Sequence, residues 1–197
     1  MRQIIGVVLL LSAAALPTGW KARLDDPSAK LDAAMFSEEK DALSFHTGPV
    51  AGIYYRPGDK AEKNYEVSAA FSQLKPSEHL EAYGLFISGQ DLDKDTQRYL
   101  YFLVRQDGKL SIRSRNGATT KPIVDWREAS PMKEPKGVKT SNTLLIRTAG
   151  DGVLFFINDK QVYRMPRAQV GGDGIAGLRI NHNLDVQVSK FTVKKQP

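Results

Sequence analysis

The groups best suited to ligand binding in this sequence are three aromatic or amide side chains, each close to a basic residue. They do not follow the apolar alternation that predicts core positions. They are Tyr54 with Arg56, where an early strand is expected to end at the Pro57-Gly58 turn, Trp126 with Arg127 at the start of a long loop, and Asn181 with His182 in a polar loop. Apolar faces of sugar rings stack on aromatic planes, whereas sugar hydroxyls pair with amides, carboxylates and arginine. These six residues are the candidate ligand-binding residues, although each also fits a structural role as core or turn.

Carboxyl groups suited to glycoside hydrolysis are also present. That reaction needs two carboxyl groups at a fixed separation, one protonated and one charged. The available acids are Glu78, Glu81, Asp91, Asp125 and Asp185. The sequence does not show that any two of them face each other. The chain has no cysteine and no Gly-x-Ser-x-Gly segment, which excludes a thiol nucleophile and argues against acyl chemistry.

Metal chemistry has one candidate segment. Asp91, Asp93 and Asp95 alternate as in the start of a calcium loop, but Thr96 and Phe102 stand where an EF-hand needs glycine and glutamate. A looser calcium site there stays open as an alternative to a solvated loop. The three histidines are isolated and lack the spacing of zinc ligands, so we expect no zinc and no organic cofactor.

The segments that carry these groups are predicted to be strands. Apolar and polar residues alternate over 65–71 and 110–115, whereas 83–87 and 99–104 are apolar on both faces, which is typical of central strands. Asp-Gly pairs at 107–108 and 151–152 predict tight hairpins, and a change of phase near Ser189 predicts a bulge. Pro27 permits a short helix, and residues 125–141 form the longest expected loop. The pattern predicts an all-β, two-sheet antiparallel jelly-roll sandwich with at most short helices.

The start of the chain has the three parts of a secretory signal. A positive charge at Arg2 is followed by an apolar run over 4–16 and by small residues. The run is shorter than the ~20 residues of a membrane span. We therefore expect a signal peptide over 1–19, cut after Ala15 or near Gly19, an N-terminal extension over 20–44 and a sandwich over 45–197. The mature chain would be periplasmic or extracellular, without a transmembrane anchor.

The charge balance argues against one class of partner. The formal net charge is +6, but the basic residues are scattered, and no nucleic-acid-binding motif accompanies them. We expect no nucleic-acid partner. The absence of cysteine means that stability comes from packing and not from disulfides.

The order of several segments resembles a known superfamily. The segments are 65–71, 83–89, 142–147, 156–162, 174–178 and 186–193. Together they resemble the concanavalin A-like lectin/glucanase superfamily, and within it the 3-keto-disaccharide hydrolase domain. The resemblance implies a two-sheet jelly roll whose concave face or rim binds carbohydrate, with glycosidase activity in some members. The Glu-x-Asp-x-x-Glu strand of the catalytic glucanases is absent from this sequence.

Three functions follow as hypotheses. The first is an exported, non-catalytic lectin-like module that binds a carbohydrate or related polyhydroxylated ligand. The second is a glycoside or 3-keto-disaccharide hydrolase, which predicts two carboxyl groups in one cleft. The third is an envelope interaction or structural protein, which predicts a flat apolar patch. The sequence leaves the ligand and the oligomeric state open.

Overall fold

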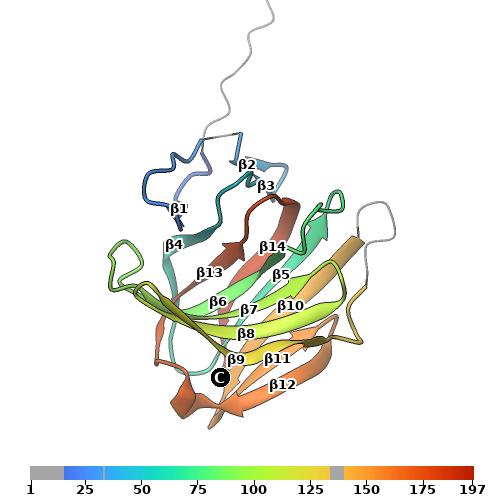
Figure 1. Ribbon diagram of the computed structural model, residues 1–197. Helices are drawn as coiled ribbons and strands as arrows, with labels where there is room; N and C mark the ends of the chain where they lie inside the picture. Colours follow the sequence, from blue (N-terminus) through green and yellow to red (C-terminus); the bar gives the residue numbers. More distant parts are fainter. Residues whose placement is uncertain (1–15, 33, 134–139) are drawn as a thin grey trace, which may run out of the picture.

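Two antiparallel sheets of seven strands each form a sandwich, as the sequence predicts (Figure 1). The computed structural model describes residues 16–32, 34–133 and 140–197, so most of the expected signal segment and part of the expected long loop lie outside the described residues. Among the described residues, no helix is long and apolar enough to cross a membrane. Within these described ranges, the one helical element is a short 3-10 turn, η1 (Arg167–Gln169).

Neighbouring strands in each sheet are joined by backbone hydrogen bonds from one edge to the other. In this spatial order, sheet A contains β1 (Lys21–Leu24), β4 (Gly52–Ala61), β13 (Gly174–Ile180), β6 (Ala82–Gln90), β7 (Arg98–Arg105), β8 (Lys109–Asn116) and β9 (Thr119–Glu128). Sheet B contains β12 (Lys160–Pro166), β11 (Gly152–Ile157), β10 (Thr140–Ala149), β5 (Tyr65–Gln73), β14 (Asp185–Lys195), β3 (Ala42–His46) and β2 (Phe36–Glu39).

The main core lies between the sheets and follows the alternation in the sequence. In β5, Val67, Ala69 and Phe71 are buried, whereas the residues between them are half-buried. Phe102 of sheet A meets Phe155 of sheet B edge to face, with ring centroids 5.4 Å apart. Because the period of two sends every second side chain to this layer, burial of apolar surface drives the two sheets together.

The predicted hairpins and bulge are confirmed. β7 pairs with β8 across Asp107-Gly108, where Gly108 has a φ of 77°. β10 pairs with β11 next to Asp151-Gly152. In β14, the register with β5 shifts between Ser189 and Thr192, so the strand changes phase where the sequence does.

Residues 20–44 contribute strands to both sheets. β1 pairs with β4 at the edge of sheet A, and β2 and β3 extend sheet B beyond β14. The described residues between 25 and 35 form turns and bends, so the short helix that Pro27 permits does not form. These strands lie together at one end of the molecule (Figure 1).

Two expected boundaries differ from the structure. The Pro57-Gly58 pair does not end a strand: β4 continues to Ala61, and residues 56–59 bulge out opposite the single residue Ala176. Trp126 lies inside β9, so the expected loop begins after Glu128. In both places the pairing of a neighbouring strand overrides the local turn signal.

The outermost strands carry features that interrupt pairing. Pro122 and the register shifts of β9 mark one edge of sheet A, and β1 at the other edge has only 4 residues. In sheet B, β12 ends at Pro166, and β2 also has 4 residues.

Candidate functional site: the concave face of sheet A

The outer face of sheet A, which points away from the main core, is concave. Asp25, directly after β1, contacts Arg115 of β8, with Nη1 and Oδ1 3.3 Å apart. Five strand spacings of about 4.8 Å, or about 24 Å in a flat sheet, separate these two strands. The two side chains meet only because the sheet curves, and Figure 1 shows β6, β7 and β8 as curved strands. We call this outer surface the concave face.

Aromatic and aliphatic side chains form the floor of the concave face. Phe86 is fully buried, and Tyr99 and Tyr101 are 4% and 6% exposed, although they point away from the main core. The ring centroids of Phe86 and Tyr99 lie 5.3 Å apart, and those of Tyr99 and Tyr101 lie 5.4 Å apart. The members of this second cluster are Ile53, Tyr55, Ala82, Phe86, Leu92, Tyr99, Tyr101 and Leu103.

An ion pair between distant parts of the chain lies over this floor. Arg179 of β13 donates from Nη1 and Nη2 to the two carboxylate oxygens of Asp25, at 2.8 and 2.5 Å. Burial by itself raises the pKa of Asp25, but the hydrogen bond and charge of Arg179 outweigh it and lower that pKa. Burial by itself lowers the pKa of Arg179, but the hydrogen bond to Asp25, together with the charges of Tyr99 and Asp25, outweighs it and raises that pKa. Both groups therefore stay charged in a protected position.

Gly84 lies next to Arg179 in the sheet. It lies opposite Arg179 on one side and Leu103 on the other, on the same face as both. A Cβ atom at Gly84 would stand 1.9 Å from the backbone oxygen of Phe102. A glycine at this position is therefore required by the backbone packing of β6 against β7.

A polar chain of contacts continues from Arg179 to the end of the face. The Arg179 Nε donates to Asn181 Oδ1 at 3.2 Å, and the Asn181 amide donates to Glu81 at 3.3 Å. His182 Nε2 lies 2.9 Å from the other oxygen of Glu81, whose side chain is 12% exposed. Two candidate ligand-binding residues, Asn181 and His182, are thus joined through one carboxylate.

Trp126 lies at the same end of the concave face. The guanidinium of Arg105 stands 4.4 Å from the centre of the indole ring. Arg105 is opposite Ala82 in the sheet, and the Ala82 carbonyl accepts a hydrogen bond from the Asn181 backbone N–H at 3.0 Å. The structure therefore brings Trp126, Asn181 and His182 to one end of one face.

The other candidate ligand-binding residues lie elsewhere. Tyr54 is fully buried in the main core, where burial raises the pKa of its hydroxyl to about 12. Arg56 stands over Trp20 and Phe191 and pairs with Asp59. Arg127 donates to the Val162 carbonyl and stands over Tyr163, on the side of β9 that faces sheet B. The reason is strand phase: neighbouring residues in a strand point to opposite faces.

Several residues of the concave face were missed by sequence reasoning. Asp25 and Arg179 are 154 positions apart, so no local pattern links them. Arg113 and Arg115 do leave a signal, because they occupy the polar phase of a strand whose other phase is apolar. Their register partners, Tyr101 and Tyr99, place them on the concave face.

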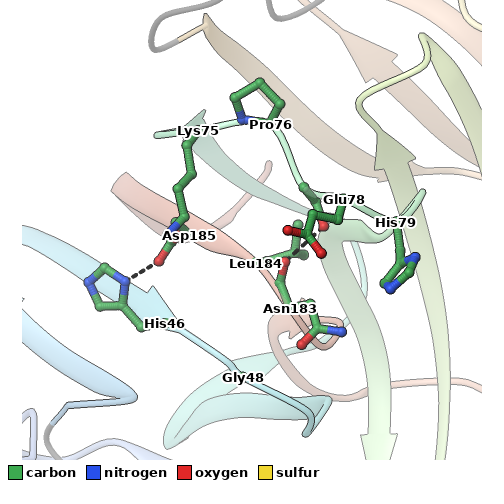
Figure 2. Close-up of a pocket in the computed structure, with 10 residues that line it drawn as sticks. His46, Gly48, Lys75, Pro76, Glu78, His79, Asn183, Leu184 and Asp185 are labelled. Carbon is green, nitrogen blue, oxygen red and sulfur yellow. Dashed lines mark hydrogen bonds and ion pairs between the residues drawn. The ribbon is translucent and has the colours of Figure 1, made fainter.

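A separate pocket of about 610 Å³ lies at the end of the sandwich, beside β3 and β14. Figure 2 shows His46 and Lys75 reaching the carboxylate of Asp185 from two sides. Glu78 and His79 line the opposite wall. Two of the acids considered for hydrolysis, Glu78 and Asp185, therefore line one pocket.

The aspartates considered for calcium do not converge. Asp91 pairs with Lys94 at 3.1 Å, and Asp95 pairs with Arg23 at 2.9 Å. Within the described part of the chain, no group of three or more His, Asp or Glu side chains is placed to hold a metal ion. The loop is held by lysine and arginine instead.

Comparison with known proteins identifies the architecture. No family profile matches the chain, and no curated protein matches its sequence. Solved structures do match. The carbohydrate-binding module CBM66 from Bacillus subtilis has a TM-score of 0.67 at 11% identity, covering 90% of this chain and 96% of its own. The fold is a jelly roll.

Two further jelly-roll structures cover this chain almost completely. A putative glycosyl hydrolase from Parabacteroides distasonis has a TM-score of 0.59 at 14% identity, covering 90% of this chain and 99% of its own. A galectin-like protein of unknown function from Bacillus subtilis has a TM-score of 0.60 at 14% identity, covering 89% of each chain. At these identities the likeness establishes the fold, which carbohydrate-binding, galectin-like and glycosidase-type proteins share.

Proposed function

We propose that this chain is an exported lectin-like module that binds a carbohydrate, or a related polyhydroxylated ligand, on the concave face without catalysing a reaction. The observation that carries the proposal is that Trp126, Asn181 and His182 lie at the same end of that face. The similarity of the fold to the carbohydrate-binding module CBM66 supports the proposal.

The chemistry of this end suits a sugar ring. Arg105 covers one face of the Trp126 indole, so a ring of the ligand would stack on the other. The amide of Asn181 and the carboxylate of Glu81 would exchange hydrogen bonds with its hydroxyls. Because Arg179 and His182 already fix both groups, little side-chain entropy is lost when a ligand binds.

A glycan array followed by calorimetry tests the proposal. Trp126→Ala should weaken binding about tenfold or more, since the stacking surface is lost. Arg127→Ala is the matched control, because it changes the next residue of β9 on the opposite side of the strand and should leave affinity unchanged. Failure of the wild-type protein to bind any sugar at millimolar concentration would overturn the proposal.

Export is a separate part of the proposal and has its own test. The signal pattern over residues 1–19 supports removal of this segment during secretion. N-terminal sequencing of protein recovered from the periplasm or medium should find a first residue between Leu16 and Lys21. Recovery of the uncut chain from the cytoplasm alone would contradict this part.

A glycoside or 3-keto-disaccharide hydrolase is the second candidate function, and the pocket in Figure 2 favours it. Asp185 is held by the His46 ring and the Lys75 ammonium group, whereas Glu78 has no ionic partner among the described residues, so the two carboxyl groups have different environments. Hydrolysis of nitrophenyl glycosides or of 3-keto-disaccharides would be lost in Asp185→Asn. The control is Asp151→Asn at an exposed position outside the pocket. No turnover by the wild type would remove this candidate.

The interaction-protein hypothesis receives little support. Among the described residues, the exposed large hydrophobic side chains are Leu16 and Leu80, which belong to separate segments. A flat apolar docking patch would need several such residues together.

A further inference from the structure

We propose that the ligand of the concave face carries carboxylate groups, so that the protein selects acidic, uronate-containing glycans, and that Arg113 determines this selectivity. The inference rests on the proposed function and specifies its ligand class. It starts from the charges on the concave face, which no sequence motif brings together.

Arginines outnumber carboxylates on this face. Asp25 pairs with both Arg179 and Arg115. Asp95 pairs with Arg23, and Asp107 pairs with Arg105 through two hydrogen bonds. Glu81 at the end of the face pairs with His182. Against these four carboxylates stand five arginines, which are Arg23, Arg105, Arg113, Arg115 and Arg179. After these internal pairs are made, Arg113 is left without a carboxylate partner among the described residues.

Arg113 is the arginine of this face without an ionic partner among the described residues. It lies opposite Tyr101 in the register of β7 and β8, two residues before Arg115. Its side chain is half-buried, which makes an unpaired charge costly to maintain. A curved apolar floor also focuses the field of the charges above it, so an anion at this point gains more than one on an open surface.

Asp25 shows how this face holds a carboxylate. Its two oxygens accept from the fork of Arg179 while Arg115 approaches from the far side of the face. Planar guanidinium groups match the geometry of a carboxylate and bind it with two parallel hydrogen bonds. Arg113 also has a guanidinium group and lies on the same strand and face as Arg115. Its N–H donors have no hydrogen-bond partner among the described residues. A uronate carboxylate is a ligand group of the matching shape and charge.

A neutral sugar would leave this charge uncompensated. Its hydroxyls accept hydrogen bonds from a guanidinium but do not neutralise it, whereas a carboxylate adds an opposite charge and accepts two parallel hydrogen bonds. The expected preference for a uronate over the matching neutral sugar is about tenfold or more.

The test uses pairs of ligands that differ only in charge. Calorimetry would compare oligomers of galacturonate, alginate and hyaluronan with the same oligomers after chemical reduction of their carboxyl groups to alcohols. The wild type should bind at least one acidic oligomer, and should bind its reduced form about tenfold more weakly. Binding of the acidic oligomer should weaken as salt increases.

Two variants locate the effect at Arg113. Arg113→Gln should reduce binding of the acidic oligomer about tenfold and leave binding of the reduced form unchanged. Lys121→Gln is the matched control: it removes the same charge from the neighbouring strand, at a position whose partner Ser114 has the opposite phase to Arg113. Thermal unfolding of both variants should match the wild type, since neither the lysine nor the arginine has an ionic partner to lose among the described residues.

The outcomes separate the inference from the function on which it rests. If neutral glycans bind and acidic ones bind no better, or if Arg113→Gln behaves like Lys121→Gln, the carboxylate inference is overturned and glycan binding stands. If neither acidic nor neutral glycans bind, both fail. Salt-sensitive binding of an acidic oligomer that is lost on carboxyl reduction and in Arg113→Gln supports the inference.

Discussion

The outer faces of the two sheets differ, although in both sheets every second residue of a strand points outward. On sheet A, the outward residues include Phe86, Tyr99 and Tyr101, which are almost fully buried. On sheet B, the outward residues of the central strands are half-buried or exposed, and they include Glu66, Ser68, Ala70, Ser72, Leu145, Arg147 and Phe156. Curvature explains the difference, because side chains converge on a concave surface and cover one another. An open surface of this protein therefore contains a second apolar core.

The largest expected effect comes from the aromatic floor. Phe86→Ala should destabilise the protein by about 3–5 kcal/mol, because a fully buried ring is replaced by a cavity. The matched change on sheet B, Phe156→Ala, should cost about 1 kcal/mol or less, since that ring is half-buried under Arg147. Urea unfolding measures both. Equal losses would show that the concave face is not a core.

The second comparison is between two ion pairs. Asp25→Ala removes the partner of the buried Arg179 and should cost about 3 kcal/mol. Glu66→Ala removes the partner of Arg147 on sheet B, where the arginine is 43% exposed, and should cost less than about 1 kcal/mol. Chemical unfolding at neutral pH would measure the two costs. A loss in Asp25→Ala no greater than that in Glu66→Ala would contradict the buried character of the first pair.

The Asp25–Arg179 ion pair should make the free energy of unfolding depend on pH. Since the pKa of Asp25 is lowered in the folded state, ionised Asp25 contributes stability above its unfolded value of 3.8. That contribution is lost as the pH falls through the lower, folded value. The stability difference between the wild type and Asp25→Asn should thus be constant above pH ~5 and shrink below pH ~4. A difference that stays constant down to pH ~2 would exclude this linkage.

The smallest expected effect concerns the inner face of β4. The Tyr54 hydroxyl is buried and has no hydrogen-bond partner among the described residues, so Tyr54→Phe should change stability by less than about 0.5 kcal/mol or increase it. The Tyr83 hydroxyl shares a hydrogen bond with Asn142, and Tyr83→Phe should cost about 1 kcal/mol. Thermal unfolding of the two variants, Tyr54→Phe and Tyr83→Phe, measures both changes in stability. A larger loss in Tyr54→Phe would mean that its hydroxyl is paired after all.

The sequence predicts the features of this fold that depend on local patterns, but not those that depend on the register of distant strands. Period-two alternation and Asp-Gly turns predict the sandwich and its hairpins because both are local properties. The two-sided apolar character of 83–87 and 99–104 even predicts central strands, although its cause on the outer side is curvature and not a covering layer. Register between distant strands has no such local signal.

The candidate site shows the same limit. Trp126, Asn181 and His182 lie at one end of the concave face, whereas Tyr54 occupies the inward phase of β4, opposite Leu178, and lies in the main core. The contact of Asp25 with Arg179 depends on β1 joining the edge of sheet A, which nothing near Asp25 in the sequence indicates. Long-range pairing therefore hides the residues that carry most of the charge on the concave face.

The interrupted edge strands have a consequence for how the protein behaves at high concentration. An exposed strand edge is a template on which another chain can add a strand, and this is a common route to fibrils. Pro122 and Pro166 each remove a backbone donor at an outer strand, and the opposite edges are only 4 residues long. Polymerisation through backbone hydrogen bonds is thereby disfavoured at all four edges. The chain has no cysteine and so no disulfide to stabilise its folded state. Its interrupted edges protect it from strand addition in the absence of such a bond.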